Sequence, residues 1–273
     1  MIIAIDIGGT KTLLAVFDTS MNIVKSIKFK TPKADYVAFL DEVRNESIEL
    51  PLEDIQAGAI GTRGVIDKEK GELVLDDKLG WSNIPLVKDF KEIFSCDFSI
   101  ENDAKMAGLS ESRADTARGY SKVLYVTVST GTNCAFAVDG KLDQNTIGAE
   151  VGKWLVEKDG KIQLWEEVIS GTWIKEQYGK LASEIDDPDA WKEITNRLAL
   201  GFINLSAAYT PDLIVVGGGV GHNFDKFGDM LQSRMKEIAH PMVSIPPVIE
   251  ASYPEDAVIY GCYYNAHDRL TAQ

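Results

Sequence analysis

The chain has 273 residues, of which 45% are hydrophobic, so it can bury a sizeable core and suits two lobes better than one. Its formal net charge of −14 disfavours anionic partners such as nucleic acid and lipid headgroups. Its three cysteines are far apart in apolar settings, which fits neither a disulfide framework nor a clustered metal site. No apolar run approaches the roughly 20 residues of a membrane span, and no signal peptide is recognisable. These features predict a cytoplasmic protein.

Short apolar runs alternate with helical patterns along the chain, which is typical of an α/β fold. In chain order we expect strands at residues 2–6, 13–18 and 23–29, a helix at 36–48, a strand at 55–61, a helix at 86–94, a strand at 97–100 and a helix at 104–114. Strands at 123–129 and 133–141 follow, then a helical pattern from Ile162 to about Ala208 that is broken near Pro188. A strand at 212–219 and helices at 224–239 and 257–270 complete the chain.

Two segments of the chain resemble each other. The sequence AIDIGGTKTLLAVFD aligns with VTVSTGTNCAFAVDG, so that Gly9-Thr10 falls on Gly131-Thr132. Each copy is predicted to be a strand, a Gly/Thr turn and a second strand. Two such units indicate two related lobes whose turns face each other across a cleft, although chance similarity between hydrophobic strands is an alternative.

The first Gly/Thr turn has the composition of a phosphate-binding turn. Asp6 ends the first apolar run, and Gly8, Gly9, Thr10 and Lys11 follow it. This is no Walker P-loop, but backbone N–H groups flanked by a hydroxyl and an ammonium suit phosphate oxygens. Because Asp6 would repel a phosphate, a divalent cation is expected between the two. The simpler interpretation is a hairpin turn with a solvated aspartate, and the turn taken alone favours it.

Four further polar side chains have both a simple and a functional interpretation. Asn102 and Asp103 stand where a helix begins, so either could be an N-cap, while a carboxylate at a strand-to-helix junction could instead accept a proton from an alcohol. Glu150 and Glu166 could hold sugar hydroxyls, or they could be an ordinary loop acid and the solvated face of a helix.

The order of these motifs resembles the ROK family of bacterial sugar kinases and sugar-responsive repressors, in the superfamily of actin and hexokinase. The resemblance runs through DIGGTKT, GAIGTRGVID, LGWSNIPL, ENDA, STGT, GAEVG, SGT and PDLIVVGGGV, and so covers nearly the whole chain. It implies a two-lobed α/β fold of the actin-like ATPase type, related to ribonuclease H, with a cleft between the lobes. The lobes are expected at residues 1–118 with 257–273 and at residues 119–256.

The resemblance also implies roles for matched residues. The general base is Asp103. The nucleotide and its phosphates are assigned to Asp6, Gly8, Gly9, Thr10, Lys11, Thr130, Gly131, Thr132, Gly217, Gly218, Gly219 and Val220. The sugar is assigned to Gly61, Asn102, Asp103, Glu150, Lys153 and Glu166. Asp6 is expected to face Mg²⁺ through water.

The chain departs from the family pattern at several positions. The second phosphate turn, usually G-T-G-x-G-G-G, is S-T-G-T-N-C-A at residues 129–135. Lys78 replaces an asparagine, and Lys153 replaces a histidine, which leaves Lys153 to take a sugar hydroxyl or to pair with Glu150. The cysteine cluster C-x-C-G-x-x-G-C is absent.

The function implied is ATP-dependent phosphorylation of a hexose or amino-hexose hydroxyl, expected at C6, with Mg-ATP between the two turns and Asp103 accepting the proton. The alternative is a non-catalytic sugar sensor of the same fold, which the eroded second turn motivates. The acidity of the chain disfavours a DNA-binding repressor. Membranes are not expected partners, and a homodimer through the second lobe is a family-level expectation.

The sequence predicts that the protein holds no structural zinc. The family's site uses one histidine and three clustered cysteines, whereas the histidine position here is Lys153, whose ammonium cannot ligate while it is charged. The loop from Val156 to Ile162 must then be held by packing, for which Trp154 and Trp165 are the candidates. Elemental analysis of protein purified without chelator should find zinc well below one per chain. Stoichiometric zinc that EDTA removes with loss of fold would contradict this prediction.

Overall fold

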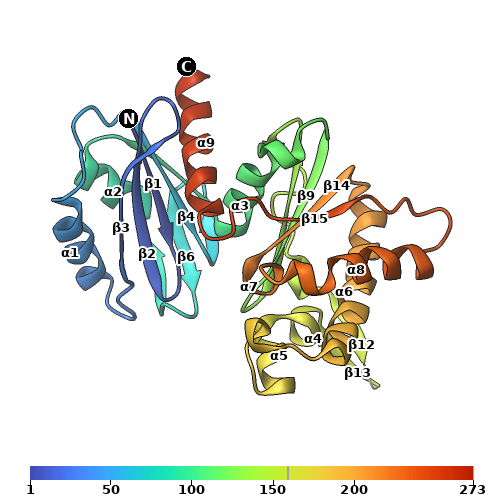
Figure 1. Cartoon of the computed structure of the whole chain (residues 1–273). Coiled ribbons are helices and arrows are strands. Elements are labelled where there is room, and N and C mark those ends of the chain that lie inside the picture. Colours follow the sequence, from blue (N-terminus) through green and yellow to red (C-terminus); the bar gives the residue numbers. More distant parts are fainter. Residues whose placement is uncertain (159, 273) are drawn as a thin grey trace. The chain divides into compact units, whose positions relative to one another are not determined.

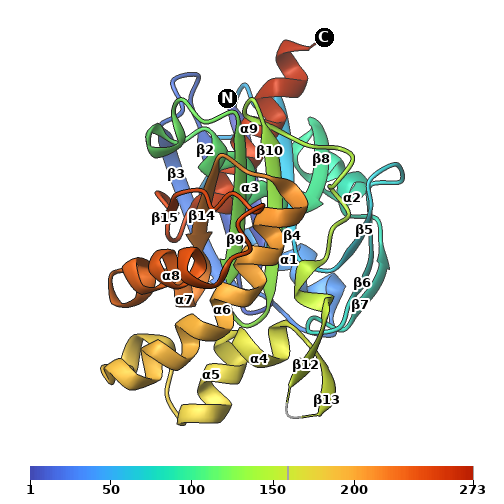
Figure 2. The same ribbon diagram turned by 90° about the vertical axis from the view of Figure 1, so that its right-hand side faces the viewer.

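The structure is a computed structural model that describes residues 1–158 and 160–272. It divides into two compact units, each with its own five-stranded sheet (Figures 1 and 2). Unit 1 comprises Met1–Ser110 and Asp256–Gln273, and unit 2 comprises Glu111–Glu255. The first boundary therefore lies earlier in the chain than Arg118, where the sequence predicted it.

The sheet of unit 1 has the strand order β3-β2-β1-β4-β8. Its strands are β1 (Ile2–Ile7), β2 (Lys11–Phe17), β3 (Ile23–Lys30), β4 (Ala57–Thr62) and β8 (Asp97–Asn102). The first three are antiparallel neighbours joined by short turns, whereas β4 and β8 run parallel to β1. Parallel neighbours need long crossovers, and in unit 1 each crossover contains one helix.

Both faces of this sheet are covered, which explains why β1 reads as a continuous apolar run. Side chains alternate between the faces. Ile3, Ile5 and Ile7 pack with α1 (Tyr36–Ser47) and α2 (Leu86–Phe94). Ile2 and Ala4 face the opposite way, toward α9 (Ala257–Thr271). The small alanines of β1, β2 and β4 on that face allow α9 to approach closely, and α3 (Asp103–Ser112) contributes Met106 to the same core.

A three-stranded sheet in unit 1 was not predicted from the sequence. Its strands are β5 (Val65–Asp67), β6 (Glu72–Asp76) and β7 (Trp81–Ile84). They are short and carry charged residues, so no apolar run marks them. Buried Trp81 joins this sheet to the main core through its ring contact with Phe39, at a centroid separation of 4.8 Å.

Unit 2 repeats the topology of unit 1. Its sheet has the order β11-β10-β9-β14-β15, again with an antiparallel hairpin next to parallel strands. The strands are β9 (Lys122–Val128), β10 (Thr132–Val138), β11 (Lys141–Leu142), β14 (Leu213–Gly217) and β15 (Val248–Glu250). The predicted repeat is thus a pair of matching β-hairpins, β1-β2 and β9-β10, each at the centre of one unit.

The helices of unit 2 include two long ones, α6 (Pro188–Tyr209) and α8 (Phe224–Ile238), which pack against each other. The shorter helices are α4 (Glu166–Ile169), α5 (Gly171–Tyr178) and α7 (Gly218–Gly221). Short 3-10 helices lie at Asp115–Ala117, Val151–Lys153 and Ala182–Glu184. Pro188 is the first residue of α6, where its missing N–H costs no hydrogen bond. None of the helices in the described part of the chain is long and apolar enough to cross a membrane.

The helical pattern predicted from Ile162 is wrong at its start. Strands β12 (Leu155–Lys158) and β13 (Lys161–Leu164) form a hairpin there, and Asp159 lies outside the described residues. The Trp165 N–H donates to the Trp154 carbonyl at 2.7 Å, and the two indole rings stack with centroids 6.1 Å apart. The two tryptophans therefore join the ends of the hairpin to each other, and their role in holding the loop stays a prediction.

Gly201 tests how closely α6 packs on this hairpin. A Cβ at Gly201 would lie 1.9 Å from Cζ2 of the fully buried Trp165. Gly201→Ala should lower the free energy of unfolding by about 1–3 kcal/mol, even though alanine favours helix by about 1 kcal/mol. Gly148→Ala is the control, because its Cβ would meet nothing within 4 Å. Urea denaturation of the two variants decides, and a Gly201→Ala protein at least as stable as the parent would contradict this packing.

Candidate active site

The carboxyl ends of three parallel strands meet at one edge of the unit 1 sheet. In the pairing register, Ile7 of β1 lies beside Thr62 of β4, and Thr62 lies beside Asn102 of β8. The next residue of each strand therefore leaves the sheet at the same level. Those residues are Gly8, Arg63 and Asp103, so the register alone brings the first Gly/Thr turn to the predicted general base.

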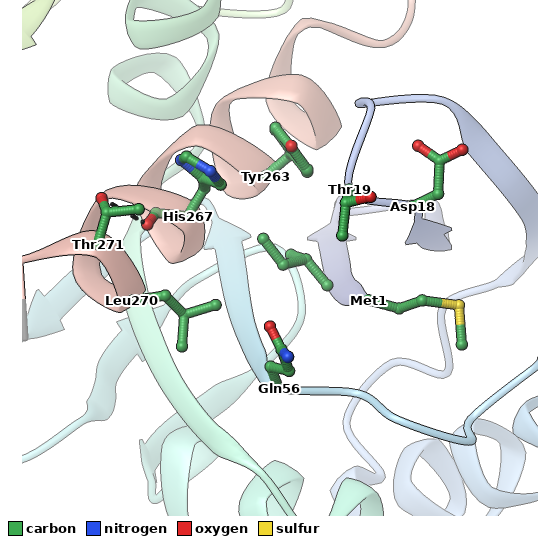
Figure 3. A pocket seen from close by; sticks show the side chains of 9 residues that line it. Met1, Asp18, Thr19, Gln56, Tyr263, His267, Leu270 and Thr271 are labelled. Carbon is green, nitrogen blue, oxygen red and sulfur yellow. Dashed lines mark hydrogen bonds between the residues drawn. The ribbon is translucent and has the colours of Figure 1, made fainter.

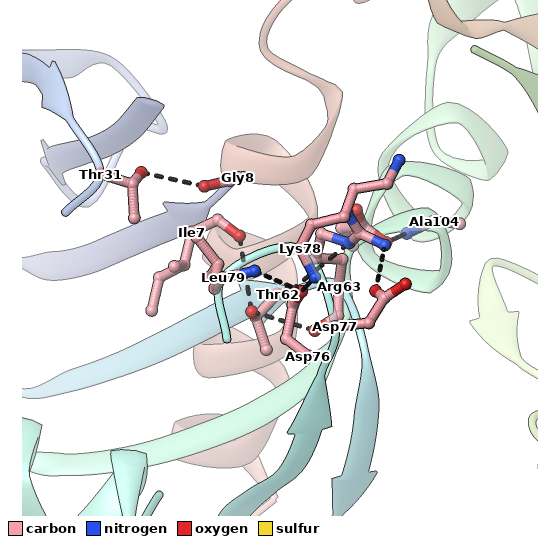
Figure 4. Close-up of polar contacts among 11 residues, drawn as sticks. Ile7, Gly8, Thr31, Thr62, Arg63, Asp76, Asp77, Lys78, Leu79 and Ala104 are labelled. Atoms are coloured by element: carbon pink, nitrogen blue, oxygen red, sulfur yellow. Dashed lines mark hydrogen bonds and ion pairs between the residues drawn. The ribbon is translucent and has the colours of Figure 1, made fainter. Parts of the chain in front are cut away.

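The first turn is a tight connection between β1 and β2. The Gly8 N–H donates to the Lys11 carbonyl at 3.0 Å, and the Thr31 hydroxyl donates to the Gly8 carbonyl at 2.9 Å (Figure 4). A Cβ at Gly8 would lie 2.8 Å from the Lys11 carbonyl oxygen, so a side chain there would force the turn open. Thr10 and Lys11 are exposed and available to a ligand.

Asp6 is the penultimate residue of β1 and precedes Gly8 by two positions. Removal from water raises the pKa of its carboxyl to about 7, and the charge of Asp103 adds to the rise. Lys28 opposes this shift, and Asp256 reinforces it. The influence of Asp103 means that two of the predicted functional carboxylates lie close enough to repel each other.

Asn102 and Asp103 combine the two interpretations that the sequence left open. The Asn102 side chain accepts the Ala104 N–H at 3.0 Å, which caps α3, and the Asp103 carboxylate accepts the same N–H at 2.7 Å. Asp103 is the first residue of α3 and is half-buried. Since Asn102 already supplies a cap, the carboxylate of Asp103 is not required for that purpose.

Sequence reasoning missed the acid that holds this junction. Glu101 is 6% exposed, accepts the Asn102 N–H at 2.8 Å and forms an ion pair with Lys68, which follows β5. A charged residue at the end of an apolar strand was a usable signal. Its partner Lys68 could not be predicted, because the two residues are far apart in the sequence and no pattern links them.

A second missed cluster surrounds Arg63. Its Nε lies 3.4 Å from Asp76 Oδ2, and its Nη2 lies 3.2 Å from Asp77 Oδ1 (Figure 4). Asp76 is 1% exposed, and its other oxygen accepts the backbone N–H groups of Lys78 and Leu79 at 2.8 and 3.0 Å. The arginine stands in the GAIGTRGVID motif, but only the fold brings it to Asp76.

Gly61 is explained first by packing. A Cβ there would lie 2.4 Å from Cγ1 of Val258 in α9 and 3.3 Å from the Cys262 sulfur. The space beside its Cα is thus filled by the protein. Only its backbone remains for the sugar contact predicted from the sequence.

The second Gly/Thr turn, in unit 2, connects β9 to β10. The Ser129 N–H donates to the Gly131 carbonyl at 2.8 Å, and the Thr172 hydroxyl donates to the Thr130 carbonyl at 2.7 Å. A Cβ at Gly171, where α5 begins, would lie 2.9 Å from the Ser129 carbonyl oxygen. The turn is therefore clamped between its own strands and the start of α5.

The predicted sugar acids lie next to this turn. Glu166 accepts the Thr132 N–H at 3.4 Å and forms an ion pair with Lys153. Glu150 instead accepts the Asn133 side-chain amide at 3.2 Å with each of its oxygens. Lys153 therefore pairs with Glu166 and not with Glu150, the partner considered from the sequence.

The glycines after β14 fill a tight space beside β9. A Cβ at Gly217 would lie 2.4 Å from the Tyr125 hydroxyl oxygen, and Gly218 has a φ of +80° with Val128 O at 2.6 Å from its Cβ position. Gly219 faces open space, and Val220 is buried. Of the four residues assigned to the nucleotide here, Gly219 is the one most accessible to a ligand.

A cavity of unit 1 lies elsewhere. It has a volume of about 280 Å³ and is lined by residues from the start of β1 and the end of α9, among them Gln56, Tyr263 and His267 (Figure 3). Ile2 pairs with Ala57 at the amino end of the parallel strands, so this cavity opens at the edge opposite to Asp103. It contains none of the predicted functional residues.

Curated relatives of the chain are sugar kinases. The N-acetylgalactosamine kinase AgaK of Shewanella sp. strain ANA-3 is 30% identical, over 81% of this chain and 82% of the relative. The N-acetyl-D-glucosamine kinase of Salmonella arizonae is 26% identical, over 97% of this chain and 98% of the relative.

Solved structures show the same fold. A ROK family glucokinase from Streptomyces griseus, in complex with glucose and AMPPNP, superposes with a TM-score of 0.80 at 22% identity, over 97% of this chain and 99% of the other. A ROK family protein from Streptococcus pneumoniae, in complex with sucrose, gives a TM-score of 0.83 at 20% identity, over 100% and 99%. The fold is therefore the two-domain actin-like ATPase fold. The sequence itself matches the ROK family over residues 2–269, so the chain belongs to the ROK family.

Proposed function

We propose that this protein is a sugar kinase that transfers the γ-phosphoryl group of ATP to a hydroxyl of a hexose or amino-hexose, at C6. Its curated relatives phosphorylate N-acetylgalactosamine and N-acetyl-D-glucosamine, according to their names, which supports an amino-hexose as acceptor. The expected partners are a small sugar and a second copy of the chain through unit 2, in the cytoplasm.

The observation that carries the proposal is the shared edge of β1, β4 and β8. Their register sets Asp103 level with Gly8, the residue that opens the first turn. A phosphoryl group on the N–H groups of that turn would lie near a carboxylate that can accept the proton of the attacking hydroxyl. Asn102 positions this carboxylate by capping the helix that carries it.

The acids at this edge also fit Mg²⁺, which carboxylate oxygens and water bind well. Burial and the charge of Asp103 raise the pKa of the Asp6 carboxyl to about 7. A bound cation would stabilise the ionised carboxylate, which this environment otherwise disfavours. Asp6 would hold the ion through water. The chemistry supplied by the ion is neutralisation of charge on the β- and γ-phosphates.

In unit 2 we assign the phosphates to Thr130, Gly131 and Thr132, and the adenosine side to Gly217–Val220. The sugar is assigned to Glu150 and Glu166. Both carboxylates are already oriented, one by Asn133 and the other by Lys153. Held in place, they can accept two sugar hydroxyls at little entropic cost.

The alternative, a sensor without turnover, rested on the eroded second turn. Three of the four replaced glycine positions, Asn133, Cys134 and Ala135, lie in strand β10 and not in the turn. Asn133 orients Glu150, and Cys134 is 1% exposed. These substitutions therefore have structural uses, which favours the kinase over the sensor.

A coupled assay for ADP release across hexoses and amino-hexoses tests the proposal. We expect sugar-dependent turnover that requires Mg²⁺. In Asp103→Asn it should fall by about two to four orders of magnitude, because the base is lost while Asn102 still caps α3. Thermal stability should barely change.

Asp229→Asn, at an exposed position on α8, is the matched control and should keep full turnover. Sugar binding detected by calorimetry without ADP release for any sugar would support the sensor instead. Near-normal turnover in Asp103→Asn would return this residue to a purely structural role.

The raised pKa of Asp6 predicts a pH-dependent stability of the metal-free protein. Its folded pKa of about 7 exceeds the unfolded value of 3.8, so the folded state binds more protons and loses stability as the pH rises between these values. Asp6→Asn, which stays neutral, should therefore gain stability relative to the parent from pH 5 to pH 8. Urea denaturation in EDTA measures this difference. If the stability difference between Asp6→Asn and the parent does not change with pH, the raised pKa of Asp6 is contradicted.

A further inference from the structure

We propose that Arg63 is a catalytic residue whose guanidinium binds the transferring phosphoryl group on the first turn. The inference rests on the proposed function and deepens it. Arg63 directly follows β4, the strand between β1 and β8. It therefore leaves the sheet between Gly8, which opens the phosphate turn, and Asp103, the proposed base.

The guanidinium lies against the backbone of the turn. Arg63 Nη1 is 3.5 Å from the position that a Cβ on Gly9 would occupy, and Lys78 Cβ is 3.9 Å from the same point. The missing side chain of Gly9 thus keeps open a space that a cationic group borders. An anion bound to the turn's N–H groups would enter that space.

Two carboxylates fix the orientation of the guanidinium. Nε faces Asp76 Oδ2 at 3.4 Å, and Nη2 faces Asp77 Oδ1 at 3.2 Å, which directs Nη1 toward Gly9. Asp76 cannot turn away, because it is buried and two backbone N–H groups hold its other oxygen. A guanidinium fixed in advance loses little entropy when it binds phosphoryl oxygens.

Of the two carboxylates, buried Asp76 stays paired with Arg63, whereas Asp77 opposes an anionic ligand only weakly. Asp77 is 77% exposed, so water and salt screen its carboxylate. The Arg63 side chain is itself 26% exposed and remains reachable. A purely structural ion pair would not require the arginine to lie on a glycine of the phosphate turn.

The transfer step balances without any further reactant. The sugar hydroxyl oxygen forms a bond to the γ-phosphorus, and the bond from that phosphorus to the β,γ-bridging oxygen breaks. The bond's electron pair leaves with ADP, and the hydroxyl proton passes to Asp103. Arg63 forms no covalent bond and gives up no proton. It donates hydrogen bonds from Nη1 to the phosphoryl oxygens, where the charge of the transition state is spread.

Arg63→Met and Arg63→Lys test the inference, with Arg44→Met as the matched control. Arg44 lies on α1 and forms an exposed ion pair with Asp41 of the same helix, at 3.0 Å. We expect Arg63→Met to lower kcat by at least about 10²-fold, with the KM for the sugar unchanged. Arg63→Lys should retain only part of the parent's kcat, because an ammonium lacks the planar, bidentate geometry of the guanidinium. Arg44→Met should behave as the parent does.

Calorimetry supplies a readout that does not depend on turnover. In the presence of Mg²⁺, Arg63→Met should bind AMPPNP about 10-fold more weakly or worse, and ADP as the parent does, because only AMPPNP carries a γ-phosphoryl group. Circular dichroism establishes that the variant is folded. If it is not, Arg63→Lys carries the comparison.

The outcomes separate the two claims. A parent protein that binds neither nucleotide overturns the proposed function, and the role of Arg63 with it. An active parent whose Arg63→Met variant keeps its kcat and its AMPPNP affinity overturns only the inference. A variant that loses turnover of glucose 1-phosphate but not of neutral sugars would show that the cation serves an anionic acceptor, which also overturns it.

Discussion

The parallel pairing of β1, β4 and β8 is the constraint on which the rest of unit 1 depends. Thr62 and Asn102 follow Ile7 by 55 and 95 positions in the chain. All three reach the same edge only because these strands share one register. A shift of one residue in β4 would turn Ile60 from one face of the sheet to the other. The buried apolar faces therefore fix the register, and the register fixes the distance between the first turn and Asp103.

The same topology in unit 2 places a second Gly/Thr turn at the corresponding place in its own sheet. The two turns are held by different means. Thr31, which directly follows β3, donates a hydrogen bond to the Gly8 carbonyl of the first turn. The second turn is held by Gly171 at the start of α5, whose N–H donates to the Ser129 carbonyl. Both arrangements leave the backbone of the turn rigid, which limits the entropy lost when phosphate oxygens bind.

Local patterns sufficed to predict much of the fold. Apolar runs such as that of β1 marked the central strands, and the ENDA motif placed Asp103 at the start of α3. The small sheet of β5–β7 had no such pattern, because its strands are short and polar residues interrupt their apolar runs. Lys153 shows a different limit. From the sequence its expected partners were a sugar hydroxyl or Glu150, and the fold brings it to Glu166 instead.

The contacts of Arg63 could not be predicted for a similar reason. Asp76 lies in a different sheet, and its burial depends on backbone N–H groups that a turn after β6 presents to it. The site therefore combines residues that motifs identify with residues that only packing identifies. The residues that only packing identifies orient those that the motifs identify.

A crystal structure with Mg²⁺, AMPPNP and N-acetylgalactosamine would test whether the edge formed by β1, β4 and β8 is the site of phosphoryl transfer. We expect the γ-phosphate to lie against the first turn beside Gly9 and Thr10, with the 6-hydroxyl of the sugar within hydrogen-bond distance of Asp103. A γ-phosphate bound away from this turn, or a sugar whose hydroxyls all lie beyond the reach of Asp103, would contradict it.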